Sequence, residues 1–240
     1  MDSLSEICGI GDLHQVFIIP WAVRSTGFRN QRVISPNSVL TLGARAVGLW
    51  TEKPQPGIKV LIPLEHMAAI EDVTILLYGR LSFLPFGDRL TIRYNTVCRE
   101  ALEPALLALR NRLAGPAQEI PPAENEVAEL SFKWQHVLRK ALVRLEESNP
   151  VVSRFARVPG WPRHAAERGQ LLVLNPFELV YVCDPTDSVG QFGEDSFVVP
   201  RSHITGIHIR ENNLEVSSNG ARFLLSMAPP LCEAAIRWLT

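Results

Sequence analysis

The chain has 240 residues, of which 46% are hydrophobic and 20% are charged, and its formal net charge is −1. This length allows one large domain or two small ones, and the composition argues against a disordered chain. A net charge near zero supplies no overall attraction to nucleic acid or to an anionic membrane, so we predict no nucleic-acid partner.

The first half of the chain reads as a series of short strands that ends in a helix. Segments rich in β-branched and aromatic residues, separated by Gly, Pro, Asn and Asp, predict strands at residues 16–19, 39–42, 46–50, 58–62, 68–73, 76–83 and 89–94. The last of these alternates apolar and polar residues, as a half-buried strand does. From Glu100 to Leu113 leucines recur at helical spacing, with Pro104 placed in the first turn, where its missing donor is tolerated.

A Pro-rich stretch, residues 114–124, follows this helix and is expected to be extended. It leads into a predicted helix from Ala123 to Glu147, whose apolar face includes Val127, Leu130, Trp134 and Val137. Two interpretations of this face are open. It packs on the second half of the chain or between the two halves, or it docks a partner protein or a second copy of the chain.

The second half of the chain repeats the order of segments found in the first. In the middle block of each half, a proline is followed three residues later by a histidine, His66 or His203, and then by spaced aliphatic residues. We interpret this pair as the same strand-boundary turn built twice rather than as a metal or catalytic motif. The preserved order indicates an internal duplication. The recurring blocks are residues 38–43 with 170–175, 63–70 with 200–207, and 87–92 with 220–225.

Strands followed by one closing helix, arranged twice, resemble the bacterial pleckstrin-homology-like (PH-like) domain family. The residues that carry the resemblance are 40–42, Ile62–Pro63, Ala69–Ile70, 79–83 and 89–92, and in the second half 172–174, Val199–Pro200, Gly206–Ile207, 214–216 and 222–225. The resemblance implies a mainly β, α+β fold of two tandem PH-like domains, small β-barrels or sandwiches that are each closed by a C-terminal amphipathic helix. It implies domains at 13–114 and 151–240, with a linker and helix at 115–150, and it implies binding and assembly rather than catalysis.

The sequence lacks recognisable patterns for catalysis, metal binding or nucleotide binding. Its four cysteines are widely spread, and there is no HExxH, GxSxG, SxxK or phosphate-binding glycine motif. We therefore predict a non-enzymatic protein with no catalytic residue, no metal and no cofactor. Cys98 and Cys232, at equivalent places near the two closing helices, are interpreted as buried structural thiols rather than reactive ones.

Two groups of basic residues are the candidate sites for an anionic ligand or a lipid headgroup. The first is Arg24, Arg29 and Arg32, which flank a predicted loop between early strands, and the second is Arg163, His164 and Arg168, at the entry to the second half. Arginines beside aromatic residues could contact a membrane surface, whereas scattered arginines are also ordinary in a solvated loop.

The favoured function is to bind another protein or to assemble with itself, with the helix at 123–147 and the loop at 184–196 as candidate contact regions. The alternative is a peripheral membrane protein that binds anionic lipid headgroups. The first fifteen residues lack the pattern of a secretory signal, and the spread cysteines suggest reduced thiols, so the expected location is the cytoplasm.

Overall fold

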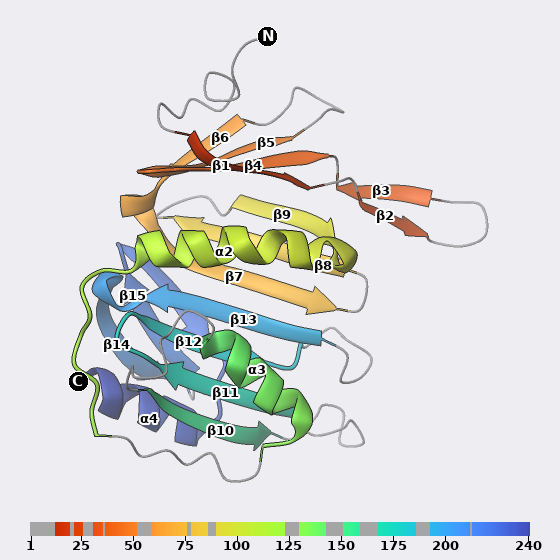
Figure 1. Cartoon of the computed structure of the whole chain (residues 1–240). Helices are drawn as coiled ribbons and strands as arrows, with labels where there is room; N and C mark the ends of the chain where they lie inside the picture. Colours follow the sequence, from red (N-terminus) through yellow and green to blue (C-terminus); the bar gives the residue numbers. More distant parts are fainter. Residues whose placement is uncertain are drawn as a thin grey trace.

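The computed structural model describes residues 13–19, 22–25, 31–35, 37–51, 59–75, 78–85, 90–122, 130–142, 151–158, 168–185, 193–211 and 213–240. These residues form a mainly β, α+β structure in which three α-helices accompany the strands (Figure 1). None of the helices in the described ranges has the length and apolar character needed to cross a membrane.

The described residues of the first half form nine strands, two short 3-10 turns and one α-helix. Most strands coincide with the β-branched and aromatic runs of the sequence. The elements are β1 (Leu13–Ile19), β2 (Ala22–Ser25), β3 (Gln31–Ser35), β4 (Ser38–Gly43), β5 (Ala46–Thr51), β6 (Lys59–Pro63), η1 (Leu64–His66), β7 (Met67–Ile75), β8 (Tyr78–Pro85), β9 (Leu90–Asn95), η2 (Thr96–Cys98) and α2 (Arg99–Leu113).

The second half begins with a helix and then follows the same plan. Its elements are α3 (Phe132–Leu142), β10 (Val152–Val158), β11 (Arg168–Leu174), β12 (Glu178–Cys183), β13 (Gly193–Pro200), η3 (Arg201–His203), β14 (Ile204–Arg210), β15 (Asn213–Ser218), β16 (Ala221–Leu225) and α4 (Pro229–Leu239). Within the range predicted as a helix, 123–147, the described helix runs from Phe132 to Leu142 and is preceded by Leu130 and Ser131 in irregular structure. Residues 123–129 and 143–147 lie outside the described residues.

The strand order repeats between the two halves. In the first, β1, β4, β5 and β6 form an antiparallel four-stranded sheet, and β7, β8 and β9 then run as a meander before α2. In the second, β10 to β13 are four neighbouring strands, and β14, β15 and β16 form a meander before α4. The first half differs by a separate hairpin, β2–β3, between β1 and β4. Among the described strands, each sheet is open and none closes into a barrel.

One sheet is shared by both halves. Strand β13 pairs antiparallel with β7, from Gly193 opposite Ile75 to Val198 opposite Ile70. This pairing joins four strands of the second half to three of the first, in the order β10-β11-β12-β13-β7-β8-β9 (Figure 1). The two halves are therefore connected by backbone hydrogen bonds and not only by a linker.

Three hydrophobic clusters hold these layers together. One lies between the first four-stranded sheet, β7–β9 and α2, and a second lies inside the second half beneath α4. The third is formed by α3 and the outer face of β11, β12 and β13. Helices α2 and α3 consequently lie on the same face of the shared sheet (Figure 1), and this places a cleft between them.

The repeated proline–histidine block folds as the predicted turn in both halves. Pro63 (φ −58°, ψ 135°) and Pro200 (φ −61°, ψ 127°) each precede a 3-10 turn. The first amide of each turn donates to a carbonyl in an equivalent hairpin, Leu64 to Arg45 and Arg201 to Phe177, both at 2.8 Å. The blocks are thus equivalent pieces of scaffold, as the sequence predicted.

Candidate functional site

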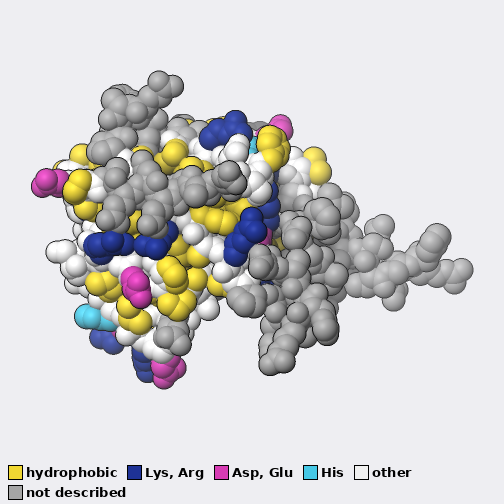
Figure 2. All heavy atoms as spheres, turned by 90° about the horizontal axis from the view of Figure 1, so that it is seen from below, with side chains coloured by type: hydrophobic (Ala, Val, Ile, Leu, Met, Phe, Trp, Pro, Cys, Tyr) yellow, Lys and Arg dark blue, Asp and Glu magenta, His cyan; other side chains and the backbone are white. Residues whose placement is uncertain are grey.

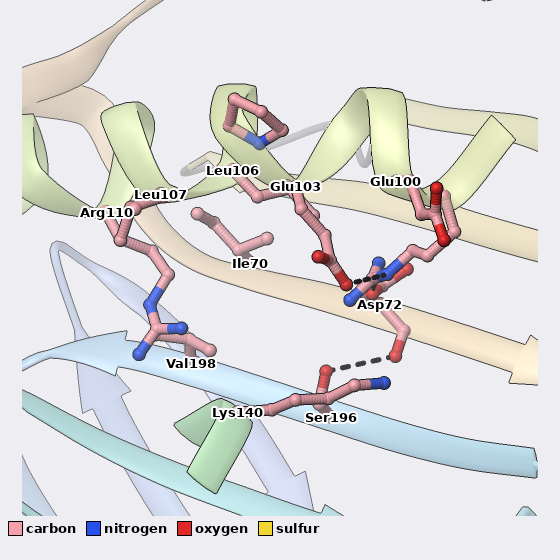
Figure 3. Close-up of a pocket in the computed structure, with 12 residues that line it drawn as sticks. Ile70, Asp72, Glu100, Glu103, Leu106, Leu107, Arg110, Lys140, Ser196 and Val198 are labelled. Carbon is pink, nitrogen blue, oxygen red and sulfur yellow. Dashed lines mark hydrogen bonds and ion pairs between the residues drawn. The ribbon is translucent and has the colours of Figure 1, made fainter. Parts of the chain in front are cut away.

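The candidate site is a cleft of about 350 Å³ between α2, α3 and the two strands that join the halves (Figure 3). Strand β7 and helix α2 belong to the first half, whereas β13 and α3 belong to the second. The residues that line the cleft are Ile70, Asp72, Arg99, Glu100, Glu103, Pro104, Leu106, Leu107, Arg110, Lys140, Ser196 and Val198.

The floor of the cleft follows from the register of β7 and β13. Val198 lies directly opposite Ile70, and Ser196 lies opposite Asp72, so these four side chains point to the helical face of the sheet. The wall formed by α2 follows from helical spacing, because Glu103, Leu107 and Arg110 are three and four residues apart. The result is an apolar floor contributed by both halves of the chain.

Pro104 lines the cleft from inside α2, five residues after the helix begins at Arg99. This corrects the expectation that it occupies the first turn. Because proline has no N–H, the carbonyl of Glu100 lacks the usual donor four residues on. That carbonyl stays available for a donor from water or from a bound molecule.

At one end of the cleft, Asp72 is the centre of a polar cluster. It accepts a hydrogen bond from the Tyr94 hydroxyl at 2.7 Å and forms an ion pair with Arg99, which also lies 3.6 Å from Glu103. Burial raises the pKa of Asp72, an effect that the Arg99 charge and the Tyr94 hydroxyl oppose. Burial acts to lower the pKa of Arg99, but Asp72, Tyr94 and Glu194 together outweigh it, so the pKa of Arg99 is raised and its charge is kept.

The Tyr94 ring is fixed by a close approach to Gly79, its partner on the neighbouring strand. A β-carbon at Gly79 would lie 2.2 Å from the ring, so no larger residue fits there without moving Tyr94. Burial and the neighbouring Asp72 charge raise the pKa of Tyr94 above its ordinary value. The phenol therefore stays protonated and remains a donor to Asp72.

At the other end of the cleft, Arg110 of α2 binds Glu178 at the start of β12. The Arg110 Nη2 donates to Glu178 Oε2 at 2.7 Å, and Nε lies 3.2 Å from Oε1. The same guanidinium donates to the carbonyl of Ala141 at the end of α3, at 3.1 Å. Glu178 is almost completely buried, so this ion pair ties α2, α3 and the shared sheet together. Nearby, Lys140 pairs with Glu194 at 2.9 Å.

Of the predicted basic residues, those that the structure describes do not line this cleft. Arg24 and Arg32 lie at facing positions of β2 and β3, on either side of the residues that connect these two strands. Arg29, Arg163 and His164 lie outside the described residues. Figure 2, which looks onto the face near α4 and β10, shows Lys and Arg side chains of the described residues spread among hydrophobic ones.

Arg168 begins β11, where it is half-buried and lines a second cavity, of about 650 Å³, on the other face of the shared sheet. Tyr181 and Cys183 line the same cavity. The loop predicted at 184–196 as a contact region is only partly described, and residues 193–196 belong to β13.

The apolar face of α3 is covered by the chain's own sheet. Leu130, Trp134 and Val137 are buried against β11, β12 and β13, while Val127 lies outside the described residues. The Trp134 ring lies 5.1 Å from that of Phe155 and rests on Gly169, where a β-carbon would be 2.2 Å from the ring. The structure therefore has the helix packed on the second half of the chain, one of the two interpretations that the sequence left open.

The cysteines of the described residues are free thiols, with Cys232 buried and Cys98 and Cys183 half-buried. The expectation of burial thus holds for Cys232 and only partly for Cys98. Burial, together with the charge of Asp195, raises the pKa of Cys183 to about 12. No group of three or more metal-ligating side chains is found in the described ranges.

The raised pKa of Cys183 predicts a loss of stability in alkaline solution. The unfolded thiol ionises near pH 9, whereas the folded one keeps its proton to about pH 12. Between these values the free energy of unfolding is expected to fall with rising pH, by up to about 1.4 kcal/mol per pH unit for this group. In urea titrations, the Cys183→Ser variant should show a shallower fall than the wild type. Parallel curves above pH 9 would contradict the assignment.

The sequence analysis missed the residues that shape the cleft. Glu178 stands in an otherwise apolar strand segment, and Asp72 follows Glu71 in a strand whose other residues are mostly apolar. A carboxylate in such a position needs a buried cation or several donors. That signal was present in the sequence. The sequence did not show which cation pairs with each carboxylate, because Arg110 and Glu178 are far apart along the chain.

No protein family, curated protein or solved structure matches the chain. The case for its function consequently rests on its own geometry.

Proposed function

We propose that the chain is a non-enzymatic binding protein made of two PH-like units, and that the cleft between α2 and α3 receives a segment of a partner protein. The observation that carries the proposal is the position of the cleft, whose floor is formed jointly by Ile70 and Val198 from the two halves. The repeated order of four strands, three strands and a helix supports two PH-like units, bounded at 13–114 and 151–240. A cytoplasmic location belongs to the same proposal.

The size of the cleft fits an anchoring side chain. About 350 Å³ is at the lower end of the range for ligand pockets and accommodates one or two large apolar side chains. Such an anchor would contact Ile70, Leu107 and Val198. Buried apolar or aromatic anchors supply most of the affinity at protein interfaces, so a short segment is sufficient for binding.

The charges at the two ends of the cleft define the rest of the partner segment. Glu100 and Glu103 lie together at one end, and Arg110 lies at the other (Figure 3). Glu100 is exposed, and so is Glu103, apart from its contact with Arg99. We therefore infer a segment with a basic residue on one side of its apolar anchor. At the other end Arg110 is already paired with Glu178, so no charge is required of the segment there.

Selection of peptides from a random display library on the full chain tests this proposal. Selected peptides should carry the basic–apolar pattern, and titration calorimetry should measure their binding. Leu107→Arg should weaken this binding at least about tenfold, since the new side chain places a charge in the apolar cleft. Leu224→Arg is the matched control, because Leu224 is exposed on β16 outside the cleft. Peptides that bind the Leu107→Arg variant as tightly as the wild type would refute the proposal that the cleft is the binding site.

Anionic lipid remains the alternative, and the facing positions of Arg24 and Arg32 on the β2–β3 hairpin favour it. Figure 1 shows this hairpin projecting from the body of the molecule. Co-sedimentation with phosphatidylserine vesicles separates the two ideas. Binding that rises with anionic lipid, and that Arg24→Ala with Arg32→Ala abolishes, would assign the function to the hairpin instead of the cleft.

A further inference from the structure

The junction between the two halves uses two strand edges, each of which has an equivalent elsewhere in the molecule. Aligning Pro63 with Pro200 makes β6 the counterpart of β13 and β14 the counterpart of β7. Strands β13 and β7 pair with each other, whereas β6 ends its sheet beside β5 and β14 ends its sheet beside β15. In the described part of the chain, β6 and β14 are thus open edges, in the upper and lower halves of Figure 1.

Equivalent residues differ in exposure according to whether their strand edge is paired or open. Val198 of β13 and Asp72 of β7 are only 7% and 5% exposed. Their counterparts, Leu61 of β6 and Ile209 of β14, are 44% and 51% exposed. Two large aliphatic side chains therefore remain in solvent at the positions that the internal junction buries.

We propose that the molecules assemble head to tail, with β6 of one molecule pairing antiparallel with β14 of the next in the register that β13 and β7 use internally. The partner is a second copy of this chain. The inference goes beyond the proposed function, takes up the self-assembly expected from the sequence, and does not depend on the cleft. Backbone groups on an open strand edge are a ready template for such pairing.

The side chains at the two edges suit each other. In the internal register Val198 faces Ile70, so Leu61 would face Ile207, and Ile209 would be its diagonal neighbour on the same face of the sheet. Leu61, Ile207 and Ile209 would bury one another there. The same register places Lys59 opposite Ile209, where Ser196 faces Asp72 at the internal junction, and a lysine side chain is long enough to keep its ammonium in water.

The internal junction, in contrast, buries a charge. Its carboxylate Glu178 requires Arg110. The counterpart of Glu178 in the first half is Ala46, since the carbonyls of Arg45 and Phe177, one residue earlier, make equivalent bonds. The external junction therefore demands no matching cation.

A histidine at each junction gives an independent argument. His203 closes the internal junction, with its Nδ1 2.8 Å from the carbonyl oxygen of Met67. The counterpart of His203 is His66, whose side chain is 62% exposed, and the counterpart of Met67 is Ile204. In the proposed pairing His66 would reach the Ile204 carbonyl of the next molecule. The turn that contains His203 would then stabilise the internal junction, and the equivalent turn that contains His66 would stabilise the junction between molecules.

Because the two surfaces differ, the contact is heterologous, and assembly continues into longer chains or a closed ring instead of stopping at a symmetric dimer. Sedimentation velocity over increasing protein concentration should show the wild-type mass growing beyond that of a dimer. Leu61→Lys and Ile209→Lys should each be monomeric alone, because every molecule then lacks one required edge. Both residues are exposed, so both variants are expected to fold, which circular dichroism checks.

The decisive measurement is the equimolar mixture of the two variants. Each supplies the intact edge that the other lacks, so the mixture should form a one-to-one dimer and nothing larger. Leu224→Lys, an exposed leucine on β16, should assemble as the wild type does. A wild type that stays monomeric at every concentration, a Leu61→Lys variant that still assembles, or a mixture that remains monomeric would overturn the proposal. Peptide binding in the cleft is measured separately on the monomeric variants. A failure of the assembly proposal is thereby distinguished from a failure of the cleft proposal.

Discussion

Replacing Arg110 with leucine should lower the free energy of unfolding by about 3–5 kcal/mol, because it leaves the buried carboxylate of Glu178 without its cation. The guanidinium also donates to the Ala141 carbonyl, so the end of α3 loses a contact as well. Urea denaturation followed by tryptophan fluorescence measures the effect, since Trp134 and Trp238 are both buried.

Two further variants show whether the loss comes from an unpaired charge. The double variant Arg110→Leu with Glu178→Leu should recover most of the stability, because it removes the stranded carboxylate together with its partner. Arg210→Leu is the matched control. Its ion pair with Glu215 spans 3.5 Å, and the Arg210 side chain is 68% exposed, so the change should cost less than about 1 kcal/mol. If Arg110→Leu lowered the free energy of unfolding no more than Arg210→Leu does, the buried ion pair would contribute no more to stability than an exposed one.

Truncating Trp134 to alanine should cost a comparable amount, about 3–5 kcal/mol, through the cavity that it leaves beneath α3. The ring contacts Phe155, rests on Gly169 and belongs to the cluster that holds α3 on the sheet. Denaturation curves give the loss in stability, and faster hydrogen exchange along α3 would show that the helix detaches.

Phe132→Ala is the control for this change, because Phe132 begins the same helix but is 80% exposed. Its effect should stay within about 0.5 kcal/mol. If Trp134→Ala left stability unchanged, the helix would not be an integral part of the fold, and its apolar face would again be a candidate surface for a partner.

Local patterns in the sequence predicted the elements that depend on local chemistry. The alternation around Ile92 and Tyr94 predicted β9, whose two apolar side chains are buried as expected. The leucines of α2 predicted its buried face, and the repeated proline blocks predicted the two 3-10 turns. In each case a period or a backbone restriction within a few residues was sufficient.

What the sequence did not reveal depends on contacts between distant segments. Nothing in Phe197 or Glu71 indicates that they become neighbours on adjacent strands, because an edge offers the same backbone groups to any strand. The β2–β3 hairpin was missed for a different reason. Its strands, AVRS and QRVIS, are short and rich in polar residues, and they resemble a loop.

The shared sheet also has a consequence for the order of events during synthesis. The first half of the chain leaves the ribosome with β7, β8, β9 and α2 complete, but the edge of β7 that faces away from β8 has no neighbour until β13 has been made, more than a hundred residues later. During that interval a nascent chain presents a bare edge that another nascent chain can occupy. The time between translation of Ile75 and of Pro200 is therefore the period of greatest risk for misassembly. A slow passage through this stretch would lower the yield of correctly folded protein.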